Sequence, residues 1–263
     1  HRDLHSFPTR RSSDLVDKNR VKSGRYAVKR FGCDTLILDD GFQYLKLQHR
    51  LEVVLVDKTN PFGNSHLLPR GVLREPVRNL KRADFIFITK SDGNSEALRA
   101  RIRELNPTAE IIECRHRSRY LQNVYTAEHV PLEWLKGRTV TSLSGIAVPQ
   151  SFENSLRLMG AKVIYCERYA DHHRYQAQEI IDAVNKAADL RADALLTTEK
   201  DAVRFPRLET TPVPVYYLRV DIELLDGAEN FHDAVEHICF KKNGRGKVAA
   251  AAEAAQETGG ERA

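Results

Sequence analysis

Residues 34–43, Asp34-Thr35-Leu36-Ile37-Leu38-Asp39-Asp40-Gly41-Phe42-Gln43, form the stretch of sequence that decides the fold. Its short apolar run predicts a buried strand of a parallel sheet. Ligands of open α/β sheets bind beyond the carboxyl ends of such strands, which is where Asp39 and Asp40 follow. Two carboxylates at this place could hold Mg²⁺ on a nucleoside triphosphate, as a Walker B acid does. The alternative is a strand followed by an ordinary Asp-Gly turn.

The composition is that of an ordinary globular protein. Of the 263 residues, 41% are hydrophobic and 29% are charged, so the chain is long enough for one large or two small domains. The formal net charge of +5 favours anionic partners such as nucleotides, phospholipid head groups or nucleic acid, without choosing among them. The four cysteines are far apart and form no CxxC pair, a pattern typical of a reducing cytosol.

Strand-like and helix-like segments alternate along the chain, which predicts an α/β fold with parallel sheets and right-handed crossovers. In the first half we expect, besides the strand at 34–38, a basic helix within 17–31, strands at 51–57, 85–90 and 110–114, and a helix capped by Ser91 or Asp92. Residues 115–137 lack a long periodic run and predict a domain boundary. Beyond it we expect strands at 139–146, 163–165, 194–198 and 213–220, and helices at 152–159, 180–188 and 230–240.

Four polar clusters fall at strand ends or in the long loop 60–76. They are Asp39-Asp40, Arg74-Glu75, Asp171-His172-His173 and Glu199-Lys200-Asp201. Arg74 could neutralise phosphate through its fork of donors, and His172, beside Asp171, could orient or tune a base near neutral pH. The structural alternatives are a surface ion pair for residues 74–75, a helix cap for Asp171 and a solvated turn for residues 199–201. Because the clusters occur in both halves of the chain, they suggest a cleft between two domains.

Four sequence patterns occur in a fixed order: DDGFQ at 39–43, FGNxxLLPxGxLREP at 62–76, DHHxY at 171–175 and TTEKDAV at 197–203. Together they resemble the tetraacyldisaccharide 4′-kinase family over about residues 16–240. The resemblance implies that ATP phosphorylates the 4′-hydroxyl of a tetraacyldisaccharide 1-phosphate, the lipid A disaccharide precursor. It places this reaction at the cytoplasmic face of the bacterial inner membrane. It also implies a P-loop parallel-sheet domain joined to a smaller C-terminal α/β domain.

The resemblance assigns a role to each matched residue. His172 matches the histidine that partners a catalytic aspartate, and Arg74 with Glu75 matches a pair that handles phosphate and metal. The expected site residues are Asp39, Asp40 and Glu75 for Mg²⁺, Arg74, Asp171 and His172 for catalysis, and Gln43, Glu199, Lys200 and Asp201 for ATP. The expected partners are the lipid precursor and the inner-membrane surface, and nucleic acid is not expected.

Three features of the family are not found in the sequence. No GxxxxGK[ST] phosphate-binding loop occurs, and neither the family's GDEP aspartate, expected as the base, nor its N-terminal membrane helix is present. We therefore expect an N-terminally truncated and inactive fragment. Its expected parts are a non-native leader at 1–15, the remainder of a P-loop kinase domain at 16–115, a C-terminal α/β domain with linker strands at 116–240 and a disordered tail at 241–263.

Two readings from other classes stay open. The DHH sequence at 171–173 also occurs in metal-dependent phosphoesterases, to which Asp39 and Asp40 could add ligands. Such an enzyme needs more metal-binding acids and histidines at strand ends than the sequence offers. The other reading is a non-catalytic fragment that binds a nucleotide or a lipid.

Overall fold

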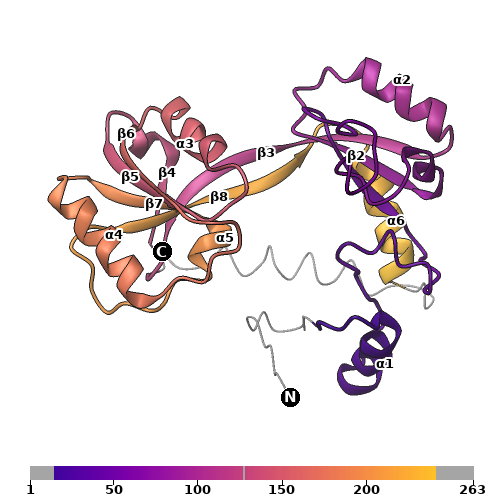
Figure 1. The fold of residues 1–263 in the computed structure, drawn as a ribbon, viewed down its shortest axis with the longest axis horizontal. Coiled ribbons are helices and arrows are strands. Elements are labelled where there is room, and N and C mark those ends of the chain that lie inside the picture. The colour runs from indigo at the N-terminus through magenta and orange to yellow at the C-terminus, as the bar shows by residue number, and fades with distance from the viewer. Residues whose placement is uncertain (1–14, 127, 241–263) are drawn as a thin grey trace, which may run out of the picture. The chain divides into compact units, whose positions relative to one another are not determined.

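The computed structural model describes residues 15–126 and 128–240, which form two compact units (Figure 1). The first unit holds the described residues up to Cys114 and those from Leu224 on, and the second holds Arg115–Glu223. Residues 224–240 therefore lie in the first unit, whereas the sequence places them in the second domain. The expected leader, apart from Leu15, and the expected tail lie outside the described residues.

The first unit is built on a parallel sheet with helices on both faces. Strands β1 (Val53–Asp57), β2 (Phe85–Thr89) and the first part of β3 (Glu110–Asn123) pair in that order. Alternate β2 side chains serve opposite faces, as the two-residue period of a strand requires. Ile86 and Ile88 pack with α2 (Glu96–Leu105) and the 3₁₀ helix η1 (Val77–Arg82), while Phe85 and Phe87 contact Phe231 of α6 (Ala228–Cys239).

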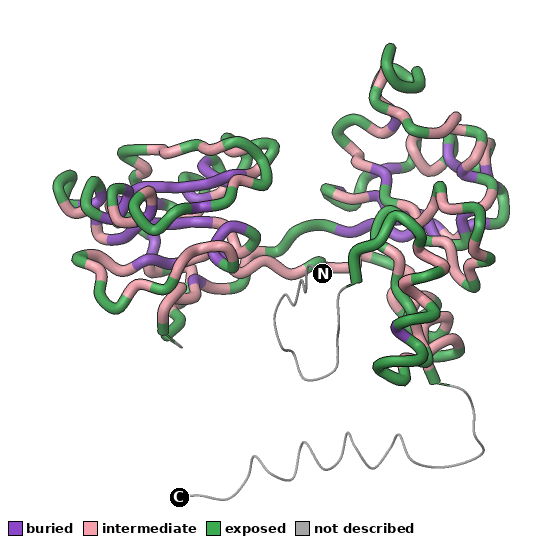
Figure 2. Tube along the Cα trace, turned by 60° about the horizontal axis from the view of Figure 1, so that its bottom comes forward, coloured by how far each residue is buried: buried purple, intermediate pink, exposed green. Residues whose placement is uncertain are grey.

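The second unit repeats this arrangement with a larger parallel sheet. Its strand order is β8 (Val215–Leu224), β7 (Ala194–Thr198), β5 (Thr139–Ser144) and β6 (Lys162–Arg168). Helix α3 (Pro149–Leu158) packs with Val140 and Leu196, and α4 (Ala177–Asp189) packs with Leu143 and Leu195 on the other face. The remaining elements are β4 (His129–Pro131), antiparallel to β3, the 3₁₀ helix η2 (Leu132–Leu135) and the short α5 (Glu199–Ala202). Figure 2 shows buried stretches in both units, and nearly all residues of β2, β5 and β7 are buried.

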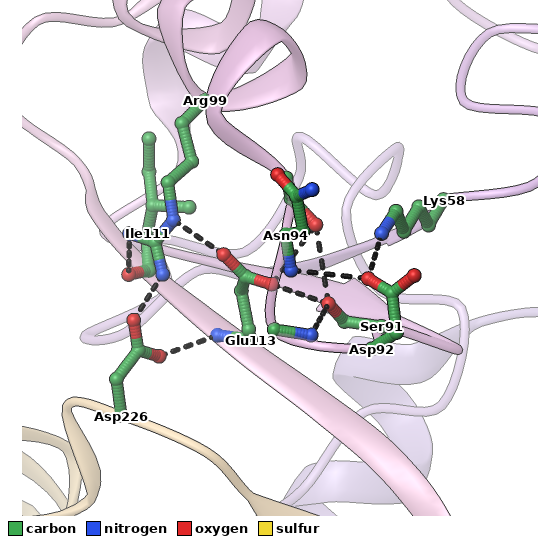
Figure 3. Close-up of polar contacts among 10 residues, drawn as sticks. Lys58, Ser91, Asp92, Asn94, Arg99, Ile111, Glu113 and Asp226 are labelled. Carbon is green, nitrogen blue, oxygen red and sulfur yellow. Dashed lines mark hydrogen bonds and ion pairs between the residues drawn. The ribbon is translucent and has the colours of Figure 1, made fainter.

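A buried carboxylate ties the elements of the first unit together (Figure 3). Glu113 on β3 is 4% exposed, and it accepts hydrogen bonds from Arg99 Nε at 2.7 Å, from Ser95 Oγ at 2.9 Å and from the Ser91 hydroxyl. Asp226, in the turn before α6, accepts the backbone N–H of Glu113 at 2.6 Å and pairs with Arg99. Burial alone would raise the pKa of Glu113, but these donors hold it below its ordinary value.

Most predicted elements are confirmed within a few residues of their ends. The basic helix within 17–31 is α1 (Arg20–Phe31), and it stops at Gly32, whose φ of 66° is the left-handed conformation that glycine adopts at helix ends. The strand expected at 110–114 is longer than predicted, because β3 continues into residues 115–123, where Arg115, Arg117 and Arg119 pair with acids of β8. Ser91 does not cap α2, since its hydroxyl is bound to Glu113.

The predicted buried strand at 34–38 is wrong. Residues 32–52 contain no strand, Ile37 is 95% exposed and Leu36 is 44% exposed. A parallel strand exists only where neighbouring backbones accept and donate its ladder of hydrogen bonds. Among the described residues no strand pairs with 34–38, so its apolar side chains remain in contact with solvent.

No helix in the described part of the chain combines the length and the apolarity that crossing a bilayer requires.

Candidate active site

The Asp39-Asp40 pair lies in a tight turn whose backbone is held from two sides. The carbonyl oxygen of Asp39 accepts a hydrogen bond from Arg20, and the carbonyl oxygen of Phe42 accepts one from Arg82 at 2.9 Å. A Cβ at Gly41 would come within 2.7 Å of Leu38 Cβ, so this turn requires glycine. The turn leaves both aspartate side chains and Gln43 exposed.

The structure brings Arg74 to this turn. Its NH1 lies 3.4 Å from Asp40 Oδ2, although the two residues are separated by a strand and a long loop. Both side chains are more than half exposed, so the pair itself adds little stability. The pair matters for function because it places an exposed carboxylate next to an exposed guanidinium.

Glu75 is held by its own loop. Its Oε2 accepts from Asn79 Nδ2 at 2.7 Å and from Arg82 NH2 at 2.9 Å. Arg82 also stacks on Phe42, 4.2 Å from the ring centroid, and therefore joins the loop of Arg74-Glu75 to the turn of Asp39-Asp40. The assignment of Glu75 to a metal stays a prediction, with one of its oxygens engaged by protein donors.

Asp39, Asp40, Arg74 and Glu75 form the first group of candidate site residues. The second group, around Asp171 and His172, lies in the other unit, where β5 and β6 end. Lys200 Nζ contacts Asp171 Oδ1 at 2.8 Å, and this hydrogen bond holds the pKa of Asp171 below its ordinary value. His172 has a φ of 64°, and its backbone N–H donates to the carbonyl oxygen of Gly145 at 3.2 Å. Its ring is 71% exposed, with Nε2 3.7 Å from Asp171 Oδ2 and Nδ1 3.2 Å from Arg204 NH2.

The Glu199-Lys200-Asp201 segment is not a solvated turn, because its three side chains take three different partners. Glu199 pairs with Arg219, and Lys200 pairs with Asp171. Asp201 is fully buried, and its Oδ2 accepts from the Gly145 N–H at 3.0 Å and from Thr198 Oγ1 at 2.7 Å. The burial argues against a direct contact of Asp201 with ATP, whereas Glu199 and Lys200 stay predicted ligand-binding residues.

His173 has a structural environment that His172 lacks. Its ring stacks on Tyr169 at 4.5 Å, and its Nε2 lies 3.0 Å from Glu179, which also belongs to the capping box of α4. Tyr175 packs edge-on to this ring, and burial followed by the charge of Asp201 raises the Tyr175 pKa well above its ordinary value. Of the two histidines, His172 is the one whose ring is available to a ligand.

The tetraacyldisaccharide-1-P 4′-kinase (LpxK) family profile matches residues 9–239 of the chain. The chain belongs to this family. A tetraacyldisaccharide 4′-kinase of Anaeromyxobacter dehalogenans strain 2CP-C is 41% identical over 221 residues, and one of Halothermothrix orenii is 34% identical over 228 residues. These alignments cover 82% and 80% of this chain but 58% and 59% of the relatives, so the chain spans about three-fifths of their length.

A solved LpxK structure has the same fold. The crystal structure of LpxK from Aquifex aeolicus in complex with ATP superposes with a TM-score of 0.60 and 26% sequence identity. The match covers 84% of this chain and 62% of that chain. The predicted family and the predicted α/β fold class are thereby confirmed.

Asp39 and Asp40 are the acids for which the sequence predicts a Mg²⁺ site. Mg²⁺ is commonly held by one or two carboxylates together with substrate phosphates and water. Asp39 and Asp40 are adjacent and exposed, as such a site requires. Within residues 15–126 and 128–240, no three histidine, cysteine or acidic side chains form a metal-binding group by themselves.

Three residues of the two groups were not predicted from sequence: Arg82, Gly145 and Arg204. The signal for Gly145 is a glycine directly after the strand Thr139–Ser144, which indicates a close approach of another group to the backbone. Arg204 follows the TTEKDAV pattern directly and could have been included in it. Nothing distinguishes Arg82 from the other basic residues around η1.

Proposed function

We propose that the protein to which this chain belongs transfers the γ-phosphoryl group of ATP to the 4′-hydroxyl of a tetraacyldisaccharide 1-phosphate. The observation that carries this proposal is the contact of Asp40 with Arg74 at 3.4 Å. Arg82 supports it by donating hydrogen bonds both to Phe42 of the turn and to Glu75 of the loop. The contact unites two of the patterns that distinguish the LpxK family. A carboxylate and a guanidinium at one place suit a reaction in which positioning and charge neutralisation supply most of the catalysis.

In this proposal, Asp39 and Asp40 would hold Mg²⁺, and the bound ion would supply positive charge to the phosphate oxygens. Arg74 is free to turn from Asp40 to a phosphate oxygen, because the pair is exposed and loosely held. Arg82 holds the turn at residues 39–43 close to the loop of Arg74 and Glu75. In the second unit, His172 offers its exposed ring to an acidic partner group, with Asp171 and Lys200 beside it.

We also propose that the protein works at an anionic membrane surface, the cytoplasmic face of the bacterial inner membrane. Helix α1 supports this because it carries five basic residues and no acidic one. Tyr26, Val28 and Phe31 of the same helix are 53%, 53% and 42% exposed. Cationic helices with exposed aromatic residues are attracted to anionic lipid head groups.

The activity is tested with the protein encoded by the longest open reading frame that contains this sequence. The purified protein, Mg²⁺ and γ-labelled ATP are incubated with tetraacyldisaccharide 1-phosphate, and the lipid products are separated by thin-layer chromatography. The expected product carries the label at the 4′-position. Asp40→Asn should lower kcat by about 10²–10³-fold, whereas Asp34→Asn, at an exposed acid of the same segment, should not. Label transfer to water alone, or equal rates in both variants, would count against the proposal.

A further inference from the structure

The ring of His172 is held at one nitrogen by Arg204. Arg204 NH2 lies 3.2 Å from Nδ1 of His172. A guanidinium has donors only and stays protonated, so Nδ1 must be the acceptor in this contact. The neutral ring then carries its proton on Nε2.

Arg204 is in turn held by Asp201. Its NH1 lies 3.8 Å from Asp201 Oδ1, and neither atom has a hydrogen-bond partner among the described residues. The backbone N–H of Arg204 donates to the carbonyl oxygen of Asp201 at 2.8 Å. Asp201 is fully buried, so its charge faces Arg204 with little screening by solvent.

The same carboxylate also fixes the backbone beneath His172. Asp201 Oδ2 binds the Gly145 N–H at 3.0 Å, and the Gly145 carbonyl oxygen accepts the His172 N–H at 3.2 Å. Asp201 therefore acts on His172 twice, on the ring through Arg204 and on the main chain through Gly145. Neither path requires a ligand to touch Asp201.

We propose that Arg204 is a positioning residue that keeps His172 as a hydrogen-bond donor through Nε2. The inference rests on the proposed kinase function, in which that Nε2–H orients a carboxylate acting on the acceptor hydroxyl. It also separates this site from a metal-binding DHH sequence. A histidine that ligates a metal through Nε2 carries its proton on Nδ1, where Arg204 leaves no acceptor.

The tautomer is measured on the 263-residue chain itself, without any need for activity. Long-range ¹H–¹⁵N correlation spectra of the neutral histidine rings distinguish protonated from unprotonated ring nitrogens. In the unchanged chain, His172 should show one tautomer, with Nε2 protonated and Nδ1 not. Arg204→Met should shift both nitrogens toward values averaged over two tautomers, and Arg204→Lys, which keeps a cationic donor, should shift them less.

Arg207→Met is the matched control, because Arg207 is an exposed arginine three residues away. The His173 resonances report whether each variant keeps the local fold, since that ring is packed on Tyr169 and Glu179. A proton on Nδ1 of His172 in the unchanged chain would overturn the proposal. So would an Arg204→Met spectrum identical to that of Arg207→Met.

A second measurement uses the protein encoded by the longest open reading frame, and it connects the tautomer to the reaction. Arg204→Met should lower kcat by roughly 10²-fold with little change in the KM for ATP, and Arg204→Lys should recover part of the loss. Unchanged kcat with an altered tautomer would show that Arg204 orients His172 without serving phosphoryl transfer. That result would overturn the role of Arg204 in the reaction and leave the proposed kinase function intact.

Discussion

The fully buried carboxylate of Asp201 accepts a hydrogen bond from the backbone N–H of Gly145 at 3.0 Å. This contact joins the end of β5 to the first turn of α5. A glycine is required for it, because a Cβ at position 145 would lie 2.7 Å from Tyr175 Oη and 3.1 Å from the Ala170 carbonyl oxygen. The polar core of the second unit therefore depends on a residue that has no side chain.

Gly145→Ala should destabilise the protein by about 1–3 kcal/mol, since the added methyl group forces its neighbours apart. The free energy of unfolding is measured by urea denaturation. Tyr175→Phe removes the nearest clashing atom, so the double variant should recover part of the loss. If the loss in the double variant equalled the sum of the two single losses, Gly145 and Tyr175 would not be in contact as described.

Glu113 should make the first unit sensitive to acid. Its folded pKa lies below the ordinary value of 4.5, so its stabilising contribution is fully present above pH 4.5. The contribution is lost as the pH falls below that value through the folded pKa. Urea midpoints measured from pH 6 to pH 3.5 should therefore decline less steeply in Glu113→Gln than in the unchanged chain.

Glu104→Gln is the control for this prediction, because Glu104 is exposed on α2. Its acid profile should follow that of the unchanged chain. At pH 7, Glu113→Gln should also lower the free energy of unfolding by roughly 1–3 kcal/mol, as Arg99 and the two serines lose a charged acceptor. An unchanged stability at pH 7 would contradict the network drawn in Figure 3.

Tyr125 should make the protein sensitive to alkali. Burial raises the pKa of its hydroxyl to about 12, and this buried oxygen has no hydrogen-bond partner among the described residues. The stability that depends on the neutral phenol is present below the ordinary pKa of 10.0 and is lost as the pH rises toward 12. Tyr125→Phe should therefore flatten the decline in thermal midpoint between pH 9 and pH 11.

At pH 8 the same variant should be neutral or more stable by up to about 1 kcal/mol, because an unpaired buried hydroxyl is removed. Tyr165→Phe, at a tyrosine that is 38% exposed, serves as the comparison. If Tyr125→Phe lost stability at pH 8, its hydroxyl would have a partner that this description lacks.

The positive face of α1 should bind anionic vesicles. Lys22→Gln combined with Lys29→Gln removes two exposed charges, each worth about 1 kcal/mol near an anionic surface, so binding should weaken roughly 30-fold. Binding is measured by sedimentation with phosphatidylglycerol vesicles at low salt. Lys136→Gln with Lys162→Gln makes the same change of net charge on exposed lysines of the second unit. Equal loss in both double variants would point to net charge and not to α1.

The apolar patterns in the sequence predicted α4 and the strands β2, β5 and β7 because each buries its own apolar side chains. They also predicted β1, although in that strand only Val56 is buried. The same argument failed at residues 34–38. An apolar run states that a segment should be buried, but the partner backbone that completes a strand is not written in the run itself. Ile37 is the clearest case, with 95% of its surface exposed.

The candidate site was predictable where a family pattern names it and unpredictable where geometry alone creates it. Asp40 and Arg74 were both expected, and the structure places them together. The burial of Asp201 could not be read from a Glu-Lys-Asp run, which has the composition of a solvated turn. In its buried position Asp201 accepts hydrogen bonds from Gly145, directly after β5, and from Thr198, the last residue of β7.

The division of the chain has a consequence for the order in which the protein is made. The second unit is continuous from Arg115 to Glu223, so all of its strands have been synthesised before the ribosome reaches α6. The first unit must wait, because the pair between Arg99 and Asp226 closes a separation of 127 residues. Contacts of that range are slow to form, and domains tend to fold as soon as they are synthesised. We expect the second unit to reach its native state before the first unit. At that stage Glu113 still lacks its contact with Asp226, and the face of β2 that carries Phe87 is not yet covered by Phe231.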